Sequence, residues 1–354
     1  MTDQSINVLV VDDSKVARML LVHLLESDPQ IRVIGSVNDG EAALEFVQHN
    51  KPDVVIMDIH MPGLDGFEAT RRIMETHPLP IIICTATTNP KEVATTFRLM
   101  EAGAVACVEK PVAREHADFE QLVTDLLQTV KLMSEVKVIR RWPRSRQIVL
   151  PGTRPSDETH PPRKIQLVGI GASTGGPPVL QTILAGLPKD FPASLLIVQH
   201  IAHGFLPGLV EWLNQTTGWQ VHIGSHGMCP LPGHAYLAPD DFQMGVINGG
   251  RILLTRDEPE NGLRPAVSYL FRSLSEMCGS KTVGVLLSGM GKDGAAELKL
   301  MKDRGASTIA QDRETSVVHG MPGEAIQLGG AVHVLPADKI ADALLTLVKR
   351  GDTV

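Results

Sequence analysis

The sequence predicts two α/β domains joined by a linker, and three observations lead to that prediction. Each half of the 354-residue chain alternates short apolar runs with longer amphipathic segments, which is typical of strand-helix units on a parallel sheet. The length is comfortable for two compact domains. A basic stretch that contains prolines separates the halves. We therefore expect a first domain at residues 1–130, a linker at 131–163 and a second domain at 164–354.

Five apolar runs in the first half have the length of strands. They alternate with longer amphipathic segments, so the first domain is expected to be a five-stranded parallel sheet. The expected strands are Asn7–Val11, Ile31–Val37, Val54–Met57, Ile81–Cys84 and Ala104–Val108.

Residues able to bind a metal and a phosphoryl group stand at the ends of these strands. Asp12 and Asp13 follow the first strand, Asp58 the third, Thr85 the fourth and Lys110 the fifth. Three carboxylates at one sheet edge repel one another, and a hard cation such as Mg²⁺ would relieve that repulsion. The metal would neutralise a phosphoryl group on Asp58, which Lys110 and Thr85 would contact. A single aspartate after a strand is usually a solvated loop residue without such a role. Five residues of suitable types at strand ends instead favour a phosphoryl site.

These residues and their neighbours resemble the receiver domain of two-component response regulators over residues 5–128. The resemblance implies a flavodoxin-like fold, phosphorylation of Asp58 by a histidine kinase, and a Mg²⁺ site of Asp12, Asp13 and Asp58 that the backbone carbonyl of His60 completes. One position departs from the family, since Cys107 stands where an aromatic switch residue is frequent. The matching phrases are Asp12-Asp13, Asp58 with Met61-Pro62-Gly63, Asp65-Gly66, Thr85-Ala86 and Lys110-Pro111.

The second half again alternates strands with helices, so we expect a doubly wound, mainly parallel α/β domain. An Asn248-Gly249-Gly250 turn predicts an antiparallel hairpin added to that sheet. Helices are expected after Gly176, Pro207, Pro265 and Gly294. The expected strands are Ile165–Gly171, Ser194–Gln199 and Thr282–Ser288, and the hairpin strands are Gln243–Ile247 and Arg251–Thr255.

A serine stands where the first of these strands meets its helix. Gly171-Ala-Ser173-Thr-Gly175 fits the pattern G-x-S-x-G, in which a tight turn exposes the serine hydroxyl. The glycines alone fit a dinucleotide-binding turn equally well. That alternative expects an acidic residue about 20 residues on, at the end of the second strand. His200 stands there instead, and an imidazole is what a serine nucleophile needs.

His200 and Asp293 are the candidate partners of Ser173. Because open α/β sheets bind ligands beyond the carboxyl ends of their strands, residues this far apart in sequence can meet. Asp293 would hold the imidazole in the productive tautomer. The non-catalytic alternatives are that His200 is a histidine packed at a strand end and that Asp293 is a helix N-cap. A metal site with His203 lacks a supporting acidic or thiol partner.

The second half also resembles the catalytic domain of the protein-glutamate methylesterases of bacterial chemotaxis. The resemblance implies Ser173 as nucleophile, His200 as base, Asp293 as its orienting acid, and backbone amides near Thr174 and Met290 as oxyanion donors, with no cofactor for the esterase reaction. Leu263 and Glu297 depart from that family's pattern. The matching phrases are Gly-Ala-Ser173-Thr-Gly-Gly-Pro, Val198-Gln-His200, Leu231 to Pro239, Arg264-Pro265, Ser288 to Ala295 and His319-Gly-Met-Pro322.

Charge and hydropathy limit the partners. The chain has a formal net charge of -7, and only residues 131–163 are basic, with 8 Lys and Arg against 3 Asp and Glu. We interpret this stretch as a linker rather than a nucleic-acid arm, because neither flanking domain is basic. No signal peptide or membrane-length apolar run is present, so we expect a cytoplasmic protein without direct membrane insertion.

The two resemblances together imply a phosphorylation-activated hydrolase of glutamate methyl esters on chemoreceptors, which would also deamidate selected glutamines. The alternative is a non-catalytic response regulator whose second domain binds a partner protein or a nucleotide. If the receiver restrains the hydrolase, its face near Thr85 and Lys110 should pack over the crevice that holds Ser173 while Asp58 is unmodified.

Overall fold

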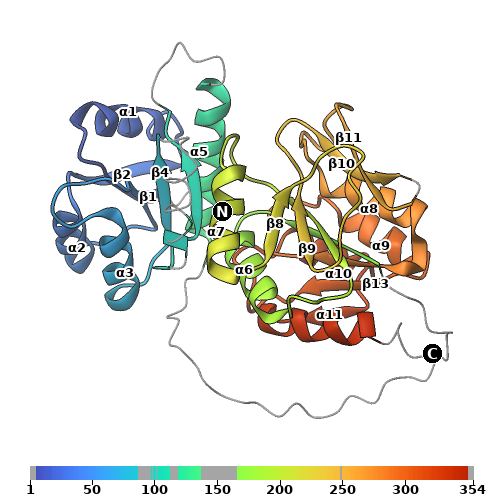
Figure 1. Ribbon diagram of the computed structural model, residues 1–354. Helices are drawn as coiled ribbons and strands as arrows, with labels where there is room; N and C mark the ends of the chain where they lie inside the picture. Colours follow the sequence, from blue (N-terminus) through green and yellow to red (C-terminus); the bar gives the residue numbers. More distant parts are fainter. Residues whose placement is uncertain are drawn as a thin grey trace.

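The computed structural model describes residues 5–86, 97, 99–100, 102–111, 119–136, 166–247 and 249–349. Most of the expected linker and Asn248 of the hairpin turn lie outside these residues. Two α/β units lie side by side (Figure 1).

The first unit is a five-stranded parallel sheet with the order β2-β1-β3-β4-β5, which is the flavodoxin-like order. All five predicted strands are present. The strands are β1 Ile6–Val11, β2 Ile31–Val37, β3 Val54–Met57, β4 Ile81–Thr85 and β5 Ala106–Glu109, and the described helices are α1 Lys15–Leu25, α2 Gly40–His49, α3 Gly66–Thr76 and α5 Phe119–Ser134.

Side-chain caps begin three of these helices next to the strand ends. Ser14 accepts a hydrogen bond from the third residue after it, and Asp39 and Asp65 do the same in their own helices. Such caps satisfy amide groups that a helix start leaves without partners. The short strand-to-helix turns therefore hold Asp12, Asp13 and Asp58 at one edge of the sheet.

The second unit is built on a seven-stranded sheet with the order β14-β13-β12-β6-β7-β9-β8. Every neighbouring pair is parallel. The predicted strands correspond to β6, β7 and β12. The strands are β6 Leu167–Ala172, β7 Ser194–Gln199, β8 Gln220–Ile223, β9 His234–Leu237, β12 Thr282–Leu286, β13 Ser307–Gln311 and β14 His333–Leu335.

Strand β6 lies at the point where the chain order of the sheet reverses. The chain passes from β6 to β7 on one side and later returns to β12 on the other, and ligands of open α/β sheets bind at such a point. The helices are α6 Gly176–Gly186, α7 Leu206–Thr217, α8 Val267–Met277, α9 Ala295–Asp303, α10 Met321–Gln327 and α11 Ile340–Lys349, with 3₁₀ turns at Gly279–Lys281 and Ala337–Lys339.

The predicted hairpin is present as β10 Gln243–Ile247 and β11 Arg251–Thr255. It forms its own two-stranded antiparallel sheet rather than an addition to the large one, so the expected attachment was wrong. The hairpin packs on helix α8 instead, where Ser273 Oγ accepts a hydrogen bond from the amide of Val246.

The glycines of β6 allow helix α8 to lie directly on the strand. A Cβ at Gly169 would stand 2.4 Å from a methyl of Leu274, and one at Gly171 would stand 2.3 Å from Val267. Both distances are far below normal contact. Two of the glycines that fitted a dinucleotide-binding turn are thus needed for helix-strand packing.

Apolar packing continues from one unit into the other. The ring of Phe97 in the first unit stacks on that of Trp212 in α7, with centroids 5.5 Å apart, and the largest cluster of buried apolar side chains contains residues of both sheets. Among the described residues, no helix has the length and apolar character needed to cross a membrane.

Candidate active site and phosphoryl site

Ser173 follows β6 in a tight turn that begins helix α6. Its amide donates to the carbonyl of Ser288 at 3.0 Å, and its carbonyl accepts from the amide of Gly176 at 2.8 Å. Gly175 has a φ of +79°, a left-handed conformation that side chains rarely adopt. The turn is therefore held on both sides, as an exposed nucleophile requires.

His200 and Asp293 meet although 93 positions separate them in the sequence. His200 Nε2 lies 3.0 Å from Asp293 Oδ2, and the two side chains are 12% and 2% exposed. The amide of His200 donates to the carbonyl of Ala172 at 2.9 Å, so His200 follows β7 directly beside the turn that carries Ser173. Ser173 and His200 line the same pocket.

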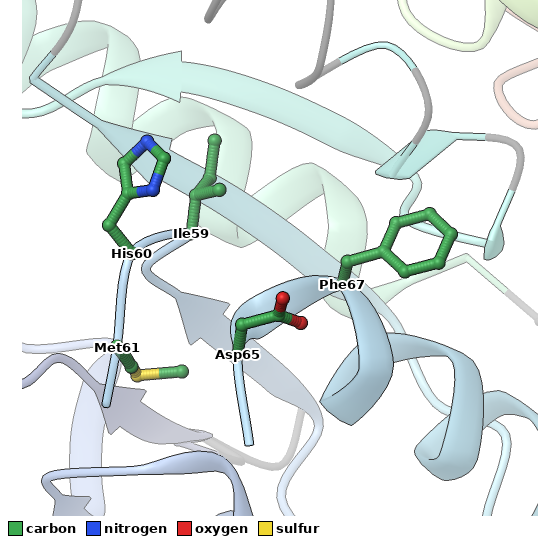
Figure 2. A pocket seen from close by; sticks show the side chains of 5 residues that line it. All are labelled: Ile59, His60, Met61, Asp65 and Phe67. Atoms are coloured by element: carbon green, nitrogen blue, oxygen red, sulfur yellow. The ribbon is translucent and has the colours of Figure 1, made fainter. Parts of the chain in front are cut away.

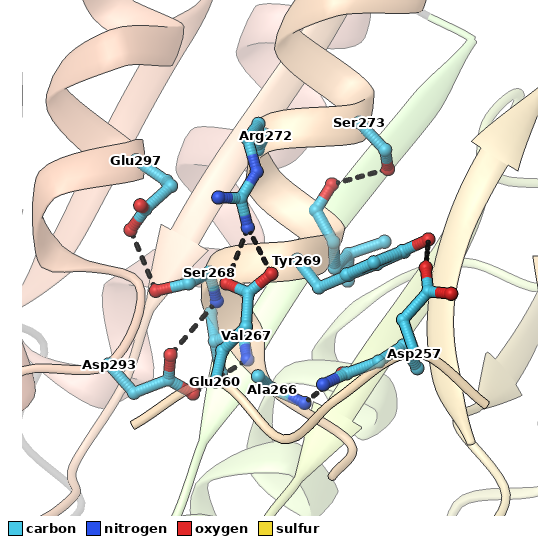
Figure 3. Close-up of polar contacts among 12 residues, drawn as sticks. Asp257, Glu260, Ala266, Val267, Ser268, Tyr269, Arg272, Ser273, Asp293 and Glu297 are labelled. Carbon is cyan, nitrogen blue, oxygen red and sulfur yellow. Dashed lines mark hydrogen bonds and ion pairs between the residues drawn. The ribbon is translucent and has the colours of Figure 1, made fainter. Parts of the chain in front are cut away.

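The carboxylate of Asp293 also receives the first two amides of helix α8 (Figure 3). Oδ2 accepts from the amide of Val267 at 2.6 Å and Oδ1 from that of Ser268 at 3.0 Å. Burial favours the neutral acid, but His200, the side chain of Ser268 and the amide of Val267 outweigh it and hold the pKa of Asp293 below its usual value. A carboxylate that stays ionised is suited to orient an imidazole and stabilise its charged form.

The helix that Asp293 caps is not the one that the sequence suggested. Gly294 occupies the N-cap position of α9, whereas the Asp293 carboxylate binds the start of α8. The reason is that Gly294, at a φ of +79°, turns the chain so that Asp293 points back toward α8.

Ser268 connects Asp293 to a second carboxylate. Its hydroxyl donates to Glu297 Oε2 at 2.7 Å and accepts from the amide of Gly294 at 2.9 Å (Figure 3). Glu297, which departs from the family pattern, therefore helps to fix the loop that carries Asp293.

The expected oxyanion donors lie on either side of the nucleophile. A Cβ at Gly289 would stand 2.8 Å from the Cβ of Ser173, so the Gly289-Met290 segment passes close to Ser173. Within the described ranges, the amides of Thr174 and Met290 donate to no protein acceptor. Their assignment as donors to an oxyanion stays a prediction.

Residues of the first unit line the pocket that contains Ser173 and His200. They come from the segment between β4 and β5, from β5 itself and from α5, and one of them is Cys107, the residue that departs from the receiver pattern. The set is Phe97, Met100, Ala106, Cys107 and Thr129. The expected packing of the first unit over the Ser173 crevice is present in this structure.

The acidic cluster of the first unit forms at the predicted edge. One ligand atom from each of Asp12, Asp13 and Asp58 lies within 4.8 Å of the others, a spacing and an all-oxygen donor set that suit Mg²⁺. Lys110 Nζ lies 2.8 Å from Asp12 Oδ2 and 3.0 Å from Asp58 Oδ2. Burial raises the pKa of Asp58 against the opposing effect of Lys110.

The remaining predicted residues of this site lie around the cluster. Thr85 is buried at the end of β4, and its carbonyl accepts from the amide of Lys110 at 2.8 Å. His60 is exposed beside Asp58 and, with Met61, Asp65 and others, lines a pocket of about 450 Å³ (Figure 2). Their roles toward a metal or a phosphoryl group stay predictions.

His203 does not join His200 in a metal site. It is exposed and pairs with Asp241, whose Oδ2 lies 3.3 Å from its Nε2. In the part of the chain that the structure describes, the acidic trio of the first unit is the only group of three or more potential metal ligands.

The residues that support Ser173, His200 and Asp293 carry no signal in the sequence. Ser268 and Ser288 contact Asp293 and Ser173 through their main-chain groups, and Gln199 contacts the Ser173 carbonyl through its side-chain amide. Glu297 stood out only because it departs from the methylesterase pattern, and no motif marked Trp212 as a contact between the two units.

Comparison with protein families identifies both units. The CheB methylesterase model matches residues 168–344, and the response regulator receiver domain model matches residues 8–119. A solved structure, the Thermotoga maritima CheB methylesterase catalytic domain, is 41% identical, with a TM-score of 0.50 over 52% of this chain and 98% of that one.

Two relatives match nearly the whole chain. A protein of Nitrosospira multiformis is 52% identical over 98% of this chain and 99% of its own length. One of Geobacter metallireducens is 54% identical over 97% and 99%. Both are named protein-glutamate methylesterase/protein-glutamine glutaminase.

Proposed function

This chain belongs to the CheB methylesterase family, and we propose that it hydrolyses glutamate methyl esters on chemoreceptors and deamidates selected glutamines in them. The observation that carries the proposal is the His200–Asp293 pair, 3.0 Å apart, in the pocket that also holds Ser173. A non-catalytic binding module would not need a buried, ionised carboxylate on an imidazole beside a serine turn.

The geometry supports an acyl-transfer reaction. Ser173 Oγ would attack the γ-carbonyl of the glutamyl ester while His200 takes its proton, and methanol would leave as His200 returns that proton. Asp293 stabilises the imidazolium meanwhile. The amides of Thr174 and Met290 would donate to the oxyanion. Water, activated by His200, would then release the glutamate.

Deamidation would use the same groups. The leaving group is then ammonia, which needs the proton of the His200 imidazolium as it departs. The relatives' names support this second activity. The expected substrate and phosphodonor are therefore chemoreceptors and a histidine kinase of a chemosensory pathway, and the expected location is the cytoplasm.

Phosphorylation of Asp58 would control the reaction. The cluster of Asp12, Asp13 and Asp58 would hold Mg²⁺, with the His60 carbonyl as a further ligand; the ion would neutralise charge on the incoming phosphoryl group. Lys110 and Thr85 would then contact the phosphoryl oxygens. The support for control is that the receiver lines the pocket of Ser173, so its movement changes access to the nucleophile.

Methanol release from a methylated receptor fragment tests the activity. The parent chain should release methanol, Ser173→Ala should not, and Ser225→Ala, a change at an exposed serine away from the pocket, should match the parent. Equal release by the parent and Ser173→Ala would refute the assignment of the nucleophile.

A further inference from the structure

Gln199 is a buried glutamine that touches the main chain of both the nucleophile and the base. It is the last residue of β7, is 5% exposed, and lies in the pocket that contains Ser173 and His200. Its Nε2 donates to the carbonyl of Ser173 at 2.9 Å and to the carbonyl of His200 at 2.8 Å.

The two contacts use the chemistry of a primary amide. Two carbonyl oxygens that face one another repel, and a group with two hydrogens between them removes the repulsion; the amide nitrogen of glutamine has two. The hydrogen bond from the amide of His200 to the carbonyl of Ala172 joins the ends of β6 and β7. The Gln199 amide adds a second connection one residue further on, at the catalytic residues themselves.

Packing leaves the amide little freedom. A Cβ at Gly176 would stand 2.3 Å from Gln199 Oε1, so the side chain occupies space that only a glycine at the start of α6 provides. A flip of the Gln199 amide that exchanged Oε1 and Nε2 would direct Oε1 at two carbonyl oxygens and is therefore unfavourable.

We propose that Gln199 is a positioning residue that sets the separation of Ser173 and His200 through its two donated hydrogen bonds. This inference rests on the proposed esterase function. An error of about 1 Å in the placement of reacting groups can lower a rate about 10²-fold. The loss should fall on kcat rather than on KM, because the amide contacts the catalytic main chain and not the receptor.

The isosteric change Gln199→Glu gives the sharpest test, since it keeps shape and replaces two donors by acceptors. Gln199→Met keeps length and removes the hydrogen bonds. Asn214→Asp is the matched control: Asn214 Nδ2 also bridges two carbonyls, those of Val210 and Val221, each at 2.9 Å. Val221 lies near the start of β8, at the sheet edge opposite to the catalytic one, because these strands are parallel.

Each full-length variant would be assayed for methanol release with acetyl phosphate and Mg²⁺, together with its thermal midpoint. We expect both Gln199 variants to lower kcat about 10²-fold while KM stays within about threefold of the parent value. Asn214→Asp should lower the thermal midpoint by a similar amount but keep kcat within about threefold of the parent value. Parental kcat in either Gln199 variant would overturn the proposal, and so would an equal kcat loss in Asn214→Asp. An inactive parent, or one matched by Ser173→Ala, would instead refute the esterase function.

Discussion

Asp293 makes more contacts than its role in the proposed triad requires. One carboxylate approaches the imidazole of His200 and receives two amides of α8. Loss of Ser173 or His200 should lower kcat by roughly 10⁴ to 10⁶, and Asp293→Asn should cost less because the base remains. The control is Asp312→Asn, whose carboxylate caps its own turn through Thr315. An indispensable Asp312 beside a dispensable Asp293 would contradict the triad.

The lowered pKa of Asp293 predicts how stability depends on pH. A carboxyl group with a depressed pKa in the folded state stabilises the protein above its unfolded pKa of about 3.9, and that contribution is lost as the pH falls through the folded value. The free energy of unfolding should thus differ most between the parent and Asp293→Asn above about pH 4, and the difference should narrow below it. Urea unfolding between pH 7 and 3 measures this; a difference that widens below pH 4 would contradict the inferred shift.

The loop after β12 packs against Ser173 through Gly289. Gly289 passes so close to Ser173 that Gly289→Ala would place a Cβ 2.8 Å from the serine Cβ and 2.3 Å from Met321 Sδ. We expect kcat to fall about 10²-fold. Gly224→Ala is the control, because its closest contact would be a flexible methionine sulfur at 3.3 Å. Methanol release by both variants is the measurement, and an unimpaired Gly289→Ala would show that the loop does not constrain Ser173.

Elements with local signals were predicted from the sequence, and those without were not. The strands β1, β3, β6, β7 and β12 are buried apolar runs followed by turn residues, and their ends carry the chemistry. Four strands of the second sheet were missed. Strands β8 and β14 are short and partly exposed edge strands. Strands β9 and β13 are mostly buried but short, and they mix polar with apolar residues. The hairpin was recognised from its turn, but its packing on α8 depends on tertiary contacts that no turn encodes. Asp293 was placed at the site, whereas the helix that it caps was not foreseen.

The two units share an apolar contact at the mouth of the site. Stacking of Phe97 on Trp212 should favour the covered arrangement by about 0.5–1.5 kcal/mol beyond area burial. Phe97→Ala should therefore raise the methanol release of the unphosphorylated chain several-fold, because about 1.4 kcal/mol changes the open-to-covered ratio tenfold. Phe191→Ala, which breaks an aromatic pair inside the catalytic unit, should lower stability without raising that rate. Equal rates for Phe97→Ala and the parent would argue against a restraining contact.

We propose that the receiver covers the Ser173 site until Asp58 is phosphorylated. The test of this restraint compares methanol release from the unphosphorylated full chain, from the same chain with acetyl phosphate and Mg²⁺, and from a fragment of residues 164–354. We predict that acetyl phosphate accelerates the full chain, that Asp58→Asn abolishes this acceleration, and that the fragment is faster than the unphosphorylated chain by about tenfold. A fragment no faster than the unphosphorylated full chain would contradict the claim and would mean that activation requires contacts supplied by the receiver.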